Sequence, residues 1–357
     1  MAPRRIPHDR LRQVVGDIFR AGGCDAAEAR DIADHLVDAN LAGHDSHGAI
    51  RVAKYVDWQR QGMVLPNRPL ETLRDDGMLL MFDGGFGYGQ SVGRAAMQAA
   101  IERVARTGVV VMALRNVGHL GRIGAWAEMA SGAGFLSLHF VNTSGFGRLV
   151  APHGGSDRRL SANPIAAGVP MPGAPPMILD MSTCVIAEGK IQVARNKGEA
   201  LPEGAVVDGS GQPTRDAEAF YATPPGAILP IAGHKGSGLS ILCEVLAGAL
   251  TGGGSTHPDN PSADRLVNNM LTILIDADSL SGRAAFAADV ERLKDWVKAS
   301  PPLAPGGEVL VPGEPERRTR QEREAAGIPL DAATLEQIAA AARMVGLDPV
   351  IVDSLAR

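Results

Sequence analysis

Apolar positions in the N-terminal part of the chain recur at helical spacing. Leucine, valine, isoleucine and phenylalanine stand three and four residues apart over 11–19, and a pair of glycines then ends the pattern. Asp25, with Glu28 three residues later, is a capping-box signature that predicts a second helix running to Leu41. A third helix is predicted over 47–60, so this part of the chain is expected to be helical.

Further along the chain, short apolar runs alternate with helical patterns. Strands are predicted over 78–82, 109–114, 135–141, 176–179 and 271–275, and helices over 91–106, 123–131, 188–196, 236–250, 284–298, 331–344 and 349–355. A charged segment covers 315–325, and the clearest linker is 301–307. We expect an α/β protein with two units, a helical one from 1–75 with 305–357 and an α/β one over 76–304.

The glycine pattern argues against the usual nucleotide-binding form of such a fold. Alternating helices and strands normally indicate a doubly wound parallel sheet, yet the chain contains no G-x-G-x-x-G. The nearest match, Gly85-Phe-Gly87, has Gln90 where the third glycine belongs. A Walker pattern is also missing, since Gly189-Lys190 is followed by isoleucine. A dinucleotide bound by this chain would need contacts of another kind.

Composition narrows the class of protein. Lys and Arg number 35 against 40 Asp and Glu, and this net charge of −5 gives no reason to expect nucleic acid or anionic lipid as a partner. No apolar run is long enough for a membrane span, and the basic, polar start is unlike a secretory signal. The three scattered cysteines lack CxxC spacing, which predicts a cytoplasmic protein without structural zinc.

The segment 43–51 gathers several reactive side chains. If a helix starts near Ser46, then His47 and Arg51 lie one turn apart on one face. An imidazole that transfers a proton beside a guanidinium that binds a carboxylate suits a 2-oxo or 2-hydroxy acid. Alternatively, the segment only caps a helix and its histidines lie on the surface. His44 with His47 is also half of a metal site, but no third ligand follows at useful spacing.

Three other segments place polar groups in glycine-rich or strand-end positions. His119 follows a predicted strand among glycines, Asp180 ends another strand, and Lys235 opens an apolar helix between glycines. The histidine at 119 suits a substrate contact, or it is a structural histidine in a turn. The carboxylate at 180 suits a group that orients a histidine, or it only caps a helix. The lysine at 235 suits a diphosphate contact, or it is solvated.

Motifs spread over nearly the whole chain form one series. They are Asp45-Ser-His-Gly48 with Arg51 and Tyr55, Asp83-Gly84, Gly87 with Gly89-Gln90, Arg115-Asn116, Gly118-His119 with Gly121, Ala151-Pro152 with Gly154-Gly155, Asn163-Pro-Ile165, Leu179-Asp-Met181, Glu188-Gly-Lys190, Pro230 with Lys235-Gly236, Val311-Pro-Gly-Glu314 and Gly327-Ile-Pro-Leu330. In this order and spacing the chain resembles the type 2 malate/L-lactate dehydrogenase family, which includes sulfolactate, ureidoglycolate and diketogulonate dehydrogenases and the piperideine-carboxylate reductases.

This resemblance implies a fold and a reaction. The expected fold is a non-Rossmann α/β fold that binds NAD(P) on a largely antiparallel sheet, with a helical domain made by the two ends of the chain. The expected reaction moves a hydride between the cofactor and C2 of a small 2-hydroxy or 2-oxo acid, or a related imino acid. The resemblance also implies a homodimer with the active site near the subunit interface, and we expect NAD rather than NADP.

The resemblance further implies roles for individual residues. His47 would donate or accept the proton with help from Ser46 and Asp180, Arg51 would hold the substrate carboxylate, and His119 would lie beside the substrate and is the other candidate for proton transfer. The remaining substrate contacts would be Gly121 and Tyr55, and the cofactor would be lined by Asn142, Thr143, Ser144, Asn163, Asp180, Met181, Ser182, Lys235 and Gly236.

Other readings stay open at this stage. A metal-dependent hydrolase or lyase would use His44, His47 and His119, and a carboxylate-binding protein without catalysis would use the same arginine. Arg122 departs from the family pattern, where a small or aromatic residue is common. Either this arginine adds positive charge near the substrate, which would suit a substrate with a second acidic group, or it points to solvent.

Overall fold

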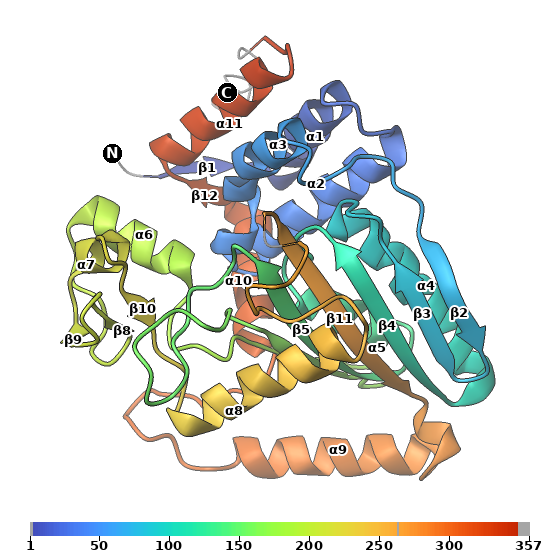
Figure 1. The fold of residues 1–357 in the computed structure, drawn as a ribbon. Helices are drawn as coiled ribbons and strands as arrows, with labels where there is room; N and C mark the ends of the chain where they lie inside the picture. The colour runs from blue at the N-terminus through green and yellow to red at the C-terminus, as the bar shows by residue number, and fades with distance from the viewer. Residues whose placement is uncertain (1–2, 263, 349–357) are drawn as a thin grey trace.

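A seven-stranded sheet forms the centre of the computed structural model, which describes residues 3–262 and 264–348 (Figure 1). Its strand order is β2 (Glu71–Asp76), β3 (Leu79–Asp83), β4 (Val109–Val117), β11 (Leu266–Ile275), β5 (Leu136–Gly145), β6 (Ile165–Val169) and β7 (Met177–Met181). Only β3 and β4 are parallel, and the other five neighbouring pairs are antiparallel. The predicted α/β fold with a largely antiparallel sheet is confirmed.

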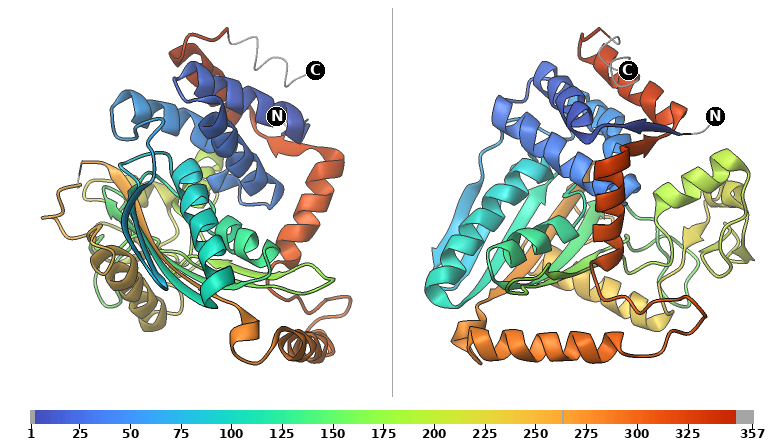
Figure 2. Two further views of the ribbon diagram at one scale, coloured as in Figure 1. Left: turned by 90° about the vertical axis from the view of Figure 1, so that its right-hand side faces the viewer. Right: turned by 180° about the vertical axis from the view of Figure 1, so that it is seen from behind.

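Helices cover both faces of this sheet (Figure 2). Helices α4 (Gly89–Thr107) and α5 (Gly124–Gly132) pack on one face, where Val141 of β5 joins their apolar cluster. The next residue on β5, Asn142, points to the opposite face and contacts η3, a π-helical segment at Glu244–Ala249 that continues α8 (His234–Cys243). Since successive strand residues point to opposite faces, α8 with η3 lies across the sheet from α4 and α5.

The two ends of the chain meet in a helical layer at one edge of the sheet. Helices α1 (His8–Ala21), α2 (Ala26–Leu41), α3 (Val52–Arg60) and α11 (Ala332–Met344) share one apolar cluster. Strands β1 (Arg4–Ile6) and β12 (Ile328–Leu330) pair antiparallel, and α10 (Glu314–Ala326) leads to them. This grouping agrees with the helical unit predicted from the chain termini, whose boundaries stay a prediction.

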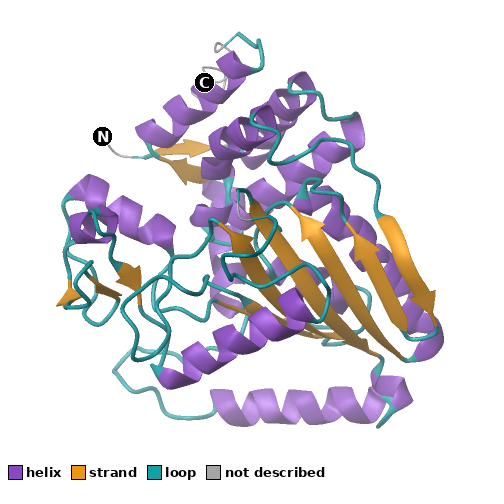
Figure 3. Ribbon diagram, viewed as in Figure 1, coloured by secondary structure: helices purple, strands orange, loops and turns teal. Residues whose placement is uncertain are grey.

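The remaining elements lie beside the sheet and below it (Figure 3). Helices α6 (Glu188–Lys197) and α7 (Ala217–Tyr221) and a small sheet of β8 (Val206–Val207), β9 (Pro213–Thr214) and β10 (Ala227–Ile228) form a third apolar cluster. Helix α9 (Arg283–Lys298), preceded by the turn η4 (Ala277–Ser279), runs along the bottom of Figure 1 without a buried residue. In the described part of the chain, no helix is both long and apolar enough to cross a bilayer.

Several predicted elements differ from the structure for physical reasons. Strand β2 has only exposed side chains, so its charged sequence shows no alternating pattern. The charged segment 315–325 is helical, as α10, although its residues are almost all polar. The helix predicted over 236–250 starts earlier and changes to π-helical geometry at Glu244. The helix predicted over 349–355 lies outside the described residues.

Half of the predicted capping box on α2 is replaced by a contact from a distant residue. The Asp25 side chain accepts from the backbone of Ala27 and Glu28, both at 2.8 Å, as predicted. Glu28, however, does not reach back to the helix start but accepts from the backbone N–H of Asn67 at 2.7 Å. The Asn67 side chain then accepts from the Asp25 backbone at 2.7 Å. A loop residue therefore completes this cap.

Candidate active site

The segment that carries His47 consists of two short turns and not of a helix start. Asp45–His47 (η1) and Ala49–Arg51 (η2) are single 3-10 turns. Gly48 between them is extended, with φ −93° and ψ −151°, and α3 begins only after the second turn. The prediction that His47 and Arg51 lie one turn apart on a helix face is therefore wrong.

Asn40, near the end of α2, accounts for this backbone path. Its side-chain nitrogen donates to Asp45 at 2.6 Å, and its side-chain oxygen accepts from the Ala49 backbone at 2.7 Å. A Cβ at Gly48 would lie 2.3 Å from this amide, so only glycine fits there. Arg323 of α10 also donates to both oxygens of Asp45, at 2.6 and 3.0 Å. Helices α2 and α10 thus hold the turns in place.

His47 and His119 lie face to face although they are far apart in the sequence. Their ring centroids are 5.5 Å apart and their planes differ by 14°. Ser46 Oγ lies 3.1 Å from His47 Nδ1, as predicted for a serine that holds this ring. The structure therefore brings together the two imidazoles that the sequence placed in separate segments.

Tyr55 and Gln90 determine which nitrogen of His119 carries a proton. Gln90 Nε2 donates to Tyr55 Oη at 3.2 Å and to the His119 carbonyl at 2.9 Å. Tyr55 Oη lies 2.6 Å from His119 Nδ1. Among the described residues Gln90 is the only other partner of this hydroxyl and it donates to it, so the hydroxyl proton is left for the ring nitrogen. Neutral His119 therefore carries its proton on Nε2, directed away from Tyr55.

Both stacked imidazoles are neutral at physiological pH. Burial lowers the pKa of His47 to about 3, and the Arg51 charge acts in the same direction. Burial also lowers the pKa of His119 well below 6.5, again with help from Arg51. A neutral imidazole accepts a proton from an alcohol, so this state suits the oxidation of a hydroxyl group. An anion bound beside Arg51 would offset its charge and raise both pKa values.

Replacing Tyr55 with phenylalanine is expected to change the tautomer of His119. The change removes the donor to Nδ1 and leaves Gln90 with one acceptor fewer, so stability falls by about 1–3 kcal/mol. Nitrogen-15 NMR of histidine-labelled protein checks the tautomer, and the unchanged protein is expected to show the Nε2–H form. Tyr88→Phe is the matched control, because the buried Tyr88 hydroxyl bonds Gln59 at 2.7 Å instead. Identical His119 signals in both variants would contradict the assignment.

Arg51 has a free end beside the histidines. Its Nε donates to the Ser46 carbonyl at 2.6 Å, which orients the guanidinium. Its two terminal nitrogens have no hydrogen-bond partner among the described residues. The side chain is only partly buried. An ordered guanidinium whose two terminal nitrogens are free can bind a carboxylate through two parallel hydrogen bonds.

Gly121 has a conformational role that its sequence position did not reveal. Its φ is +72°, and a Cβ there would lie 2.2 Å from His35 Nε2. The same nitrogen of His35 accepts from the Arg122 backbone at 2.9 Å. Burial lowers the pKa of His35 to about 3, so its ring stays a neutral acceptor. The substrate contact predicted for Gly121 stays a prediction.

Asp180 and Arg122 both point into the interior. Asp180 Oδ2 accepts from the Gly124 backbone at 2.9 Å, and no described hydrogen bond joins it to Ser46 or His47. Its predicted assistance to His47 stays a prediction. The Arg122 side chain is only 1% exposed and is paired with Glu128, so the reading in which it points to solvent is wrong.

His44 points away from the histidine pair. Its Nε2 lies 3.5 Å from Glu316 of α10, and both side chains are partly exposed. Within residues 3–262 and 264–348, no three His, Cys, Asp or Glu side chains are grouped as a metal site would require. The geometry therefore gives no support to the hydrolase reading based on His44, His47 and His119.

The residues predicted to line the cofactor belong to one connected region. Asn142 donates to Glu244 at 2.9 Å, and Asn163 donates to the other oxygen of Glu244 at 2.7 Å. Asn163 Oδ1 accepts from the Thr143 backbone at 3.2 Å, and Ser144 Oγ is buried without a partner. Asn142, Ser144 and Asn163 are fully buried, and the side chains of Asn142 and Asn163 tie β5 and the segment before β6 to Glu244 of η3.

The start of α8 lies next to the Asp180–Ser182 segment. The Ile231 backbone donates to the Thr183 carbonyl at 3.0 Å, and Ser182 Oγ donates to the Ala162 carbonyl at 2.9 Å. Lys235, in the first turn of α8, is exposed, and its ammonium has no partner among the described residues. A Cβ at Gly236 would lie 2.1 Å from the Ile231 carbonyl, so the turn is tightly closed. A free cation on a glycine turn at a helix start fits the diphosphate of a dinucleotide.

Sequence reasoning missed three residues that support the site. Gln90 belongs to a family motif and takes the place of the third glycine of G-x-G-x-x-G, but no role was predicted for it; His35 and Glu244 lie within predicted helices, also without a predicted role. All three are buried, at 1%, 6% and 6% exposed. Their partners lie on other elements, so no spacing pattern identifies them.

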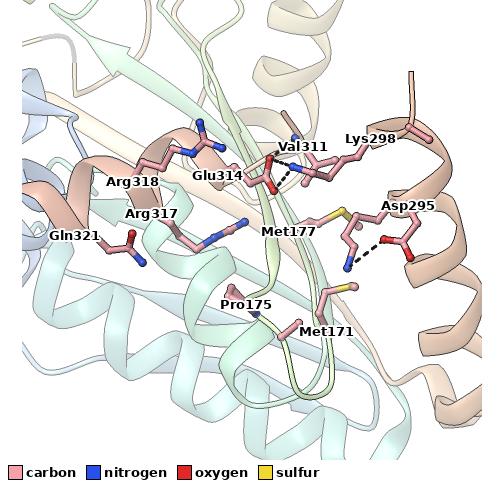
Figure 4. A pocket seen from close by; sticks show the side chains of 13 residues that line it. Met171, Pro175, Met177, Asp295, Lys298, Val311, Glu314, Arg317, Arg318 and Gln321 are labelled. Atoms are coloured by element: carbon pink, nitrogen blue, oxygen red, sulfur yellow. Dashed lines mark hydrogen bonds and ion pairs between the residues drawn. The ribbon is translucent and has the colours of Figure 1, made fainter. Parts of the chain in front are cut away.

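A cavity of about 550 Å³ lies between α9, α10 and the turn that joins β6 to β7 (Figure 4). Four of its charged side chains pair with one another: Lys298 donates to both oxygens of Glu314 at 2.7 and 2.8 Å, and Lys294 lies 3.7 Å from Asp295. None of the predicted catalytic or substrate-binding residues is among its lining residues.

Comparisons with known proteins place the chain among dehydrogenases. A family model described as malate/L-lactate dehydrogenase matches residues 6–339. The hydroxycarboxylate dehydrogenase B of Escherichia coli K12 is 40% identical over 345 residues, which cover 96% of this chain and 95% of that protein. An L-lactate dehydrogenase of Cupriavidus necator is 41% identical over 87% of this chain and 89% of its own length. The solved structure of a putative malate/lactate dehydrogenase from E. coli covers 99% of this chain and 98% of its own, with a TM-score of 0.93 and 38% identity.

Proposed function

The chain belongs to the malate/L-lactate dehydrogenase family, and from this premise we propose which of its residues carry out the reaction. It is an NAD(P)-dependent oxidoreductase that moves a hydride to or from C2 of a small 2-hydroxy or 2-oxo acid, or a related imino acid. The observation that carries the assignment of residues is the stacked pair of neutral imidazoles, 5.5 Å apart, beside the free end of Arg51. This arrangement combines proton transfer with carboxylate binding.

Each residue has one task in this proposal. Arg51 binds the substrate carboxylate through its two terminal nitrogens and so places C2 beside the imidazoles. In the oxidative direction, neutral His47 accepts the proton of the C2 hydroxyl, while Ser46 holds the ring at Nδ1. Asp180 assists by stabilising the charge that His47 gains. His119 directs its Nε2–H toward the substrate, since Tyr55 occupies Nδ1.

The cofactor is held by residues of the connected region around Asn163. When bound, the nicotinamide supplies or takes the hydride, and the protein contributes position and charge. Lys235 would contact the diphosphate, and the Asp180–Ser182 segment next to it would line the channel. We propose NAD as the preferred cofactor over NADP.

Substrate and cofactor are tested together in one assay. Pyruvate, oxaloacetate, sulfopyruvate and a cyclic imino acid are each mixed with NADH or NADPH, and the loss of reduced cofactor is followed by absorbance. We expect turnover of at least one 2-oxo acid, faster with NADH than with NADPH, and no effect of EDTA. Unchanged absorbance across the whole panel would overturn the proposal and favour a binding protein. Loss of activity in EDTA would favour a metal-dependent enzyme.

A homodimer is part of the proposal and is supported by an exposed apolar face. Along α8 and η3 the exposed apolar side chains are Leu239, Ile241, Leu242, Val245 and Leu250, at 36–65% exposure. Contiguous apolar surface of this kind is typical of a protein interface. The family resemblance also implies an active site near the subunit contact.

The double variant Ile241→Asp/Val245→Asp is expected to yield a monomer. Two carboxylates on adjacent turns of the exposed face would be desolvated in the interface, which costs more than the contact provides. Light scattering after size exclusion should give twice the chain mass for the unchanged protein. Trp296→Asp, on the exposed side of α9, is the control that should stay dimeric. An unchanged mass in the double variant would place the interface elsewhere.

A cytoplasmic location completes the proposal. Cys24, Cys184 and Cys243 are buried free thiols in separate parts of the fold. Burial raises the pKa of all three thiols, which keeps them protonated and unreactive. Reduced, unreactive cysteines are typical of proteins in a reducing compartment.

A further inference from the structure

Arg122 is an unusual residue to find in the interior of this protein. The residue is 2% exposed, and its Nη2 donates to Glu128 in the middle of α5. Its Nε and Nη1 are buried and have no hydrogen-bond partner among the residues that the structure describes. Guanidinium groups are rarely buried with donors unpaired, because the cost of removing the charge from water is then only partly offset. Such placement requires an explanation.

Gly124 brings the free side of this guanidinium next to Asp180. A Cβ built at Gly124 would lie 2.8 Å from Asp180 Oδ2 and 2.9 Å from Arg122 Nη1. The carboxylate oxygen and the unpaired nitrogen therefore both lie within 3 Å of the position that a Cβ of residue 124 would take, although no ion pair joins them directly. The Gly124 N–H also donates to Asp180 Oδ2 at 2.9 Å. The glycine allows the two charges to approach, and a larger residue would separate them.

The charges around Asp180 come from three directions. Burial raises the pKa of Asp180, while His44, the residue before η1, and Arg122 lower it and Glu128 of α5 raises it. The backbone N–H of Gly124 also lowers this pKa. Arg122 is the permanent cation of this set, because an arginine does not lose its proton in a protein. Without Arg122, burial and Glu128 would still disfavour the charged carboxylate, so the pKa of Asp180 would rise.

We propose that Arg122 is a positioning residue of the proton-transfer step, which acts through its charge by keeping the Asp180 carboxylate ionised while His47 gains its proton. This inference rests on the proposed function, in which Asp180 stabilises the proton on His47. Direct binding of a second acidic group of the substrate is the competing idea. The structure favours the first, because the Arg122 side chain is covered and its free Nη1 and the Asp180 carboxylate both lie next to Gly124.

The pH dependence of kcat/KM for hydroxyacid oxidation tests the inference. On acidification Asp180 protonates before His47, because the pKa of Asp180 lies above its ordinary value of 3.8 and that of His47 is about 3. The acid limb of the profile therefore reports Asp180. In Arg122→Met we expect this limb to move to higher pH by about one unit or more. Arg122→Lys keeps a cation at this position, so its acid limb should lie close to that of the unchanged protein.

Two further variants separate this effect from general damage. Glu128→Gln removes the opposing charge and keeps Arg122, so the acid limb should move to lower pH. In an Asp180→Asn background, Arg122→Met should cause no additional shift, because the group through which it acts is gone. If Arg122→Met does not fold, Glu128→Gln still tests the inference. The melting temperature of every variant is measured to detect loss of stability.

The possible results decide between the ideas. An acid limb that stays in place in both Arg122→Met and Glu128→Gln overturns the inference, even if Asp180→Asn is inactive and the proposed function stands. A loss of kcat/KM of tenfold or more for a dicarboxylic substrate alone, with lactate unaffected, assigns Arg122 to the substrate instead and also overturns it. An unchanged protein inactive on the whole substrate panel refutes the proposed function itself.

Discussion

Replacing His47 with asparagine is expected to lower kcat by about two to four orders of magnitude in both directions of the reaction. Asparagine keeps a polar group beside Ser46 but cannot accept or donate the transferred proton. Substrate binding depends on Arg51, so KM should change little. Steady-state kinetics at saturating cofactor check this split between kcat and KM.

His8→Asn is the control for this variant, since His8, at the start of α1, contacts Asp9 and Arg12 and none of the proposed site residues. It should keep the kinetics of the unchanged protein. His119→Asn is compared in the same assay, because its imidazole stacks on that of His47. A larger loss of kcat in His119→Asn, with activity retained in His47→Asn, would assign the proton transfer to His119.

Changing Arg51 to alanine should lower kcat/KM by about 10²–10⁴-fold, mainly through a higher KM. Two hydrogen bonds to a charged group contribute about 1.5–3 kcal/mol each, and both are lost with the guanidinium. Arg51→Lys should recover only a small part, because a single ammonium cannot form the parallel pair of bonds. Steady-state kinetics with a monocarboxylic 2-oxo acid give both values.

The contact between Arg51 and the Ser46 carbonyl predicts a smaller second effect. This bond, at 2.6 Å, helps to hold the turn that carries His47, so kcat should also fall by several-fold in Arg51→Ala. Arg60→Ala, at the exposed end of α3, is the control and should be neutral. A KM equal to that of the unchanged protein would show that another group binds the carboxylate.

Local patterns predicted most of the helices and strands of this protein. The apolar spacing over 11–19 led to α1, and alternating or continuous apolar runs led to the central strands of the sheet. These signals are strong because one face of each element is buried in the same core. Strand β2 and helix α10 escaped prediction because neither contains a buried residue.

The candidate site was predictable in its residue types but not in its geometry. His47, Arg51 and His119 could be named from chemistry and family resemblance. The backbone path around His47 could not be predicted, because hydrogen bonds from the Asn40 side chain, near the end of α2, hold the segment as two short turns and not as a helix. The tautomer of His119 likewise depends on Tyr55 and Gln90, which come from two different helices.

The sequence by itself determined the class of fold, the absence of a Rossmann fingerprint, the likeness to a dehydrogenase family and the residues able to react. Those properties depend on near neighbours in the chain, through periodicity and motif spacing. The tertiary structure alone decided that two imidazoles stack, that both are neutral, and that Arg122 lies buried beside Asp180. These properties depend on burial and on charges from distant segments, and a free energy of desolvation exists only once the chain has folded around a group.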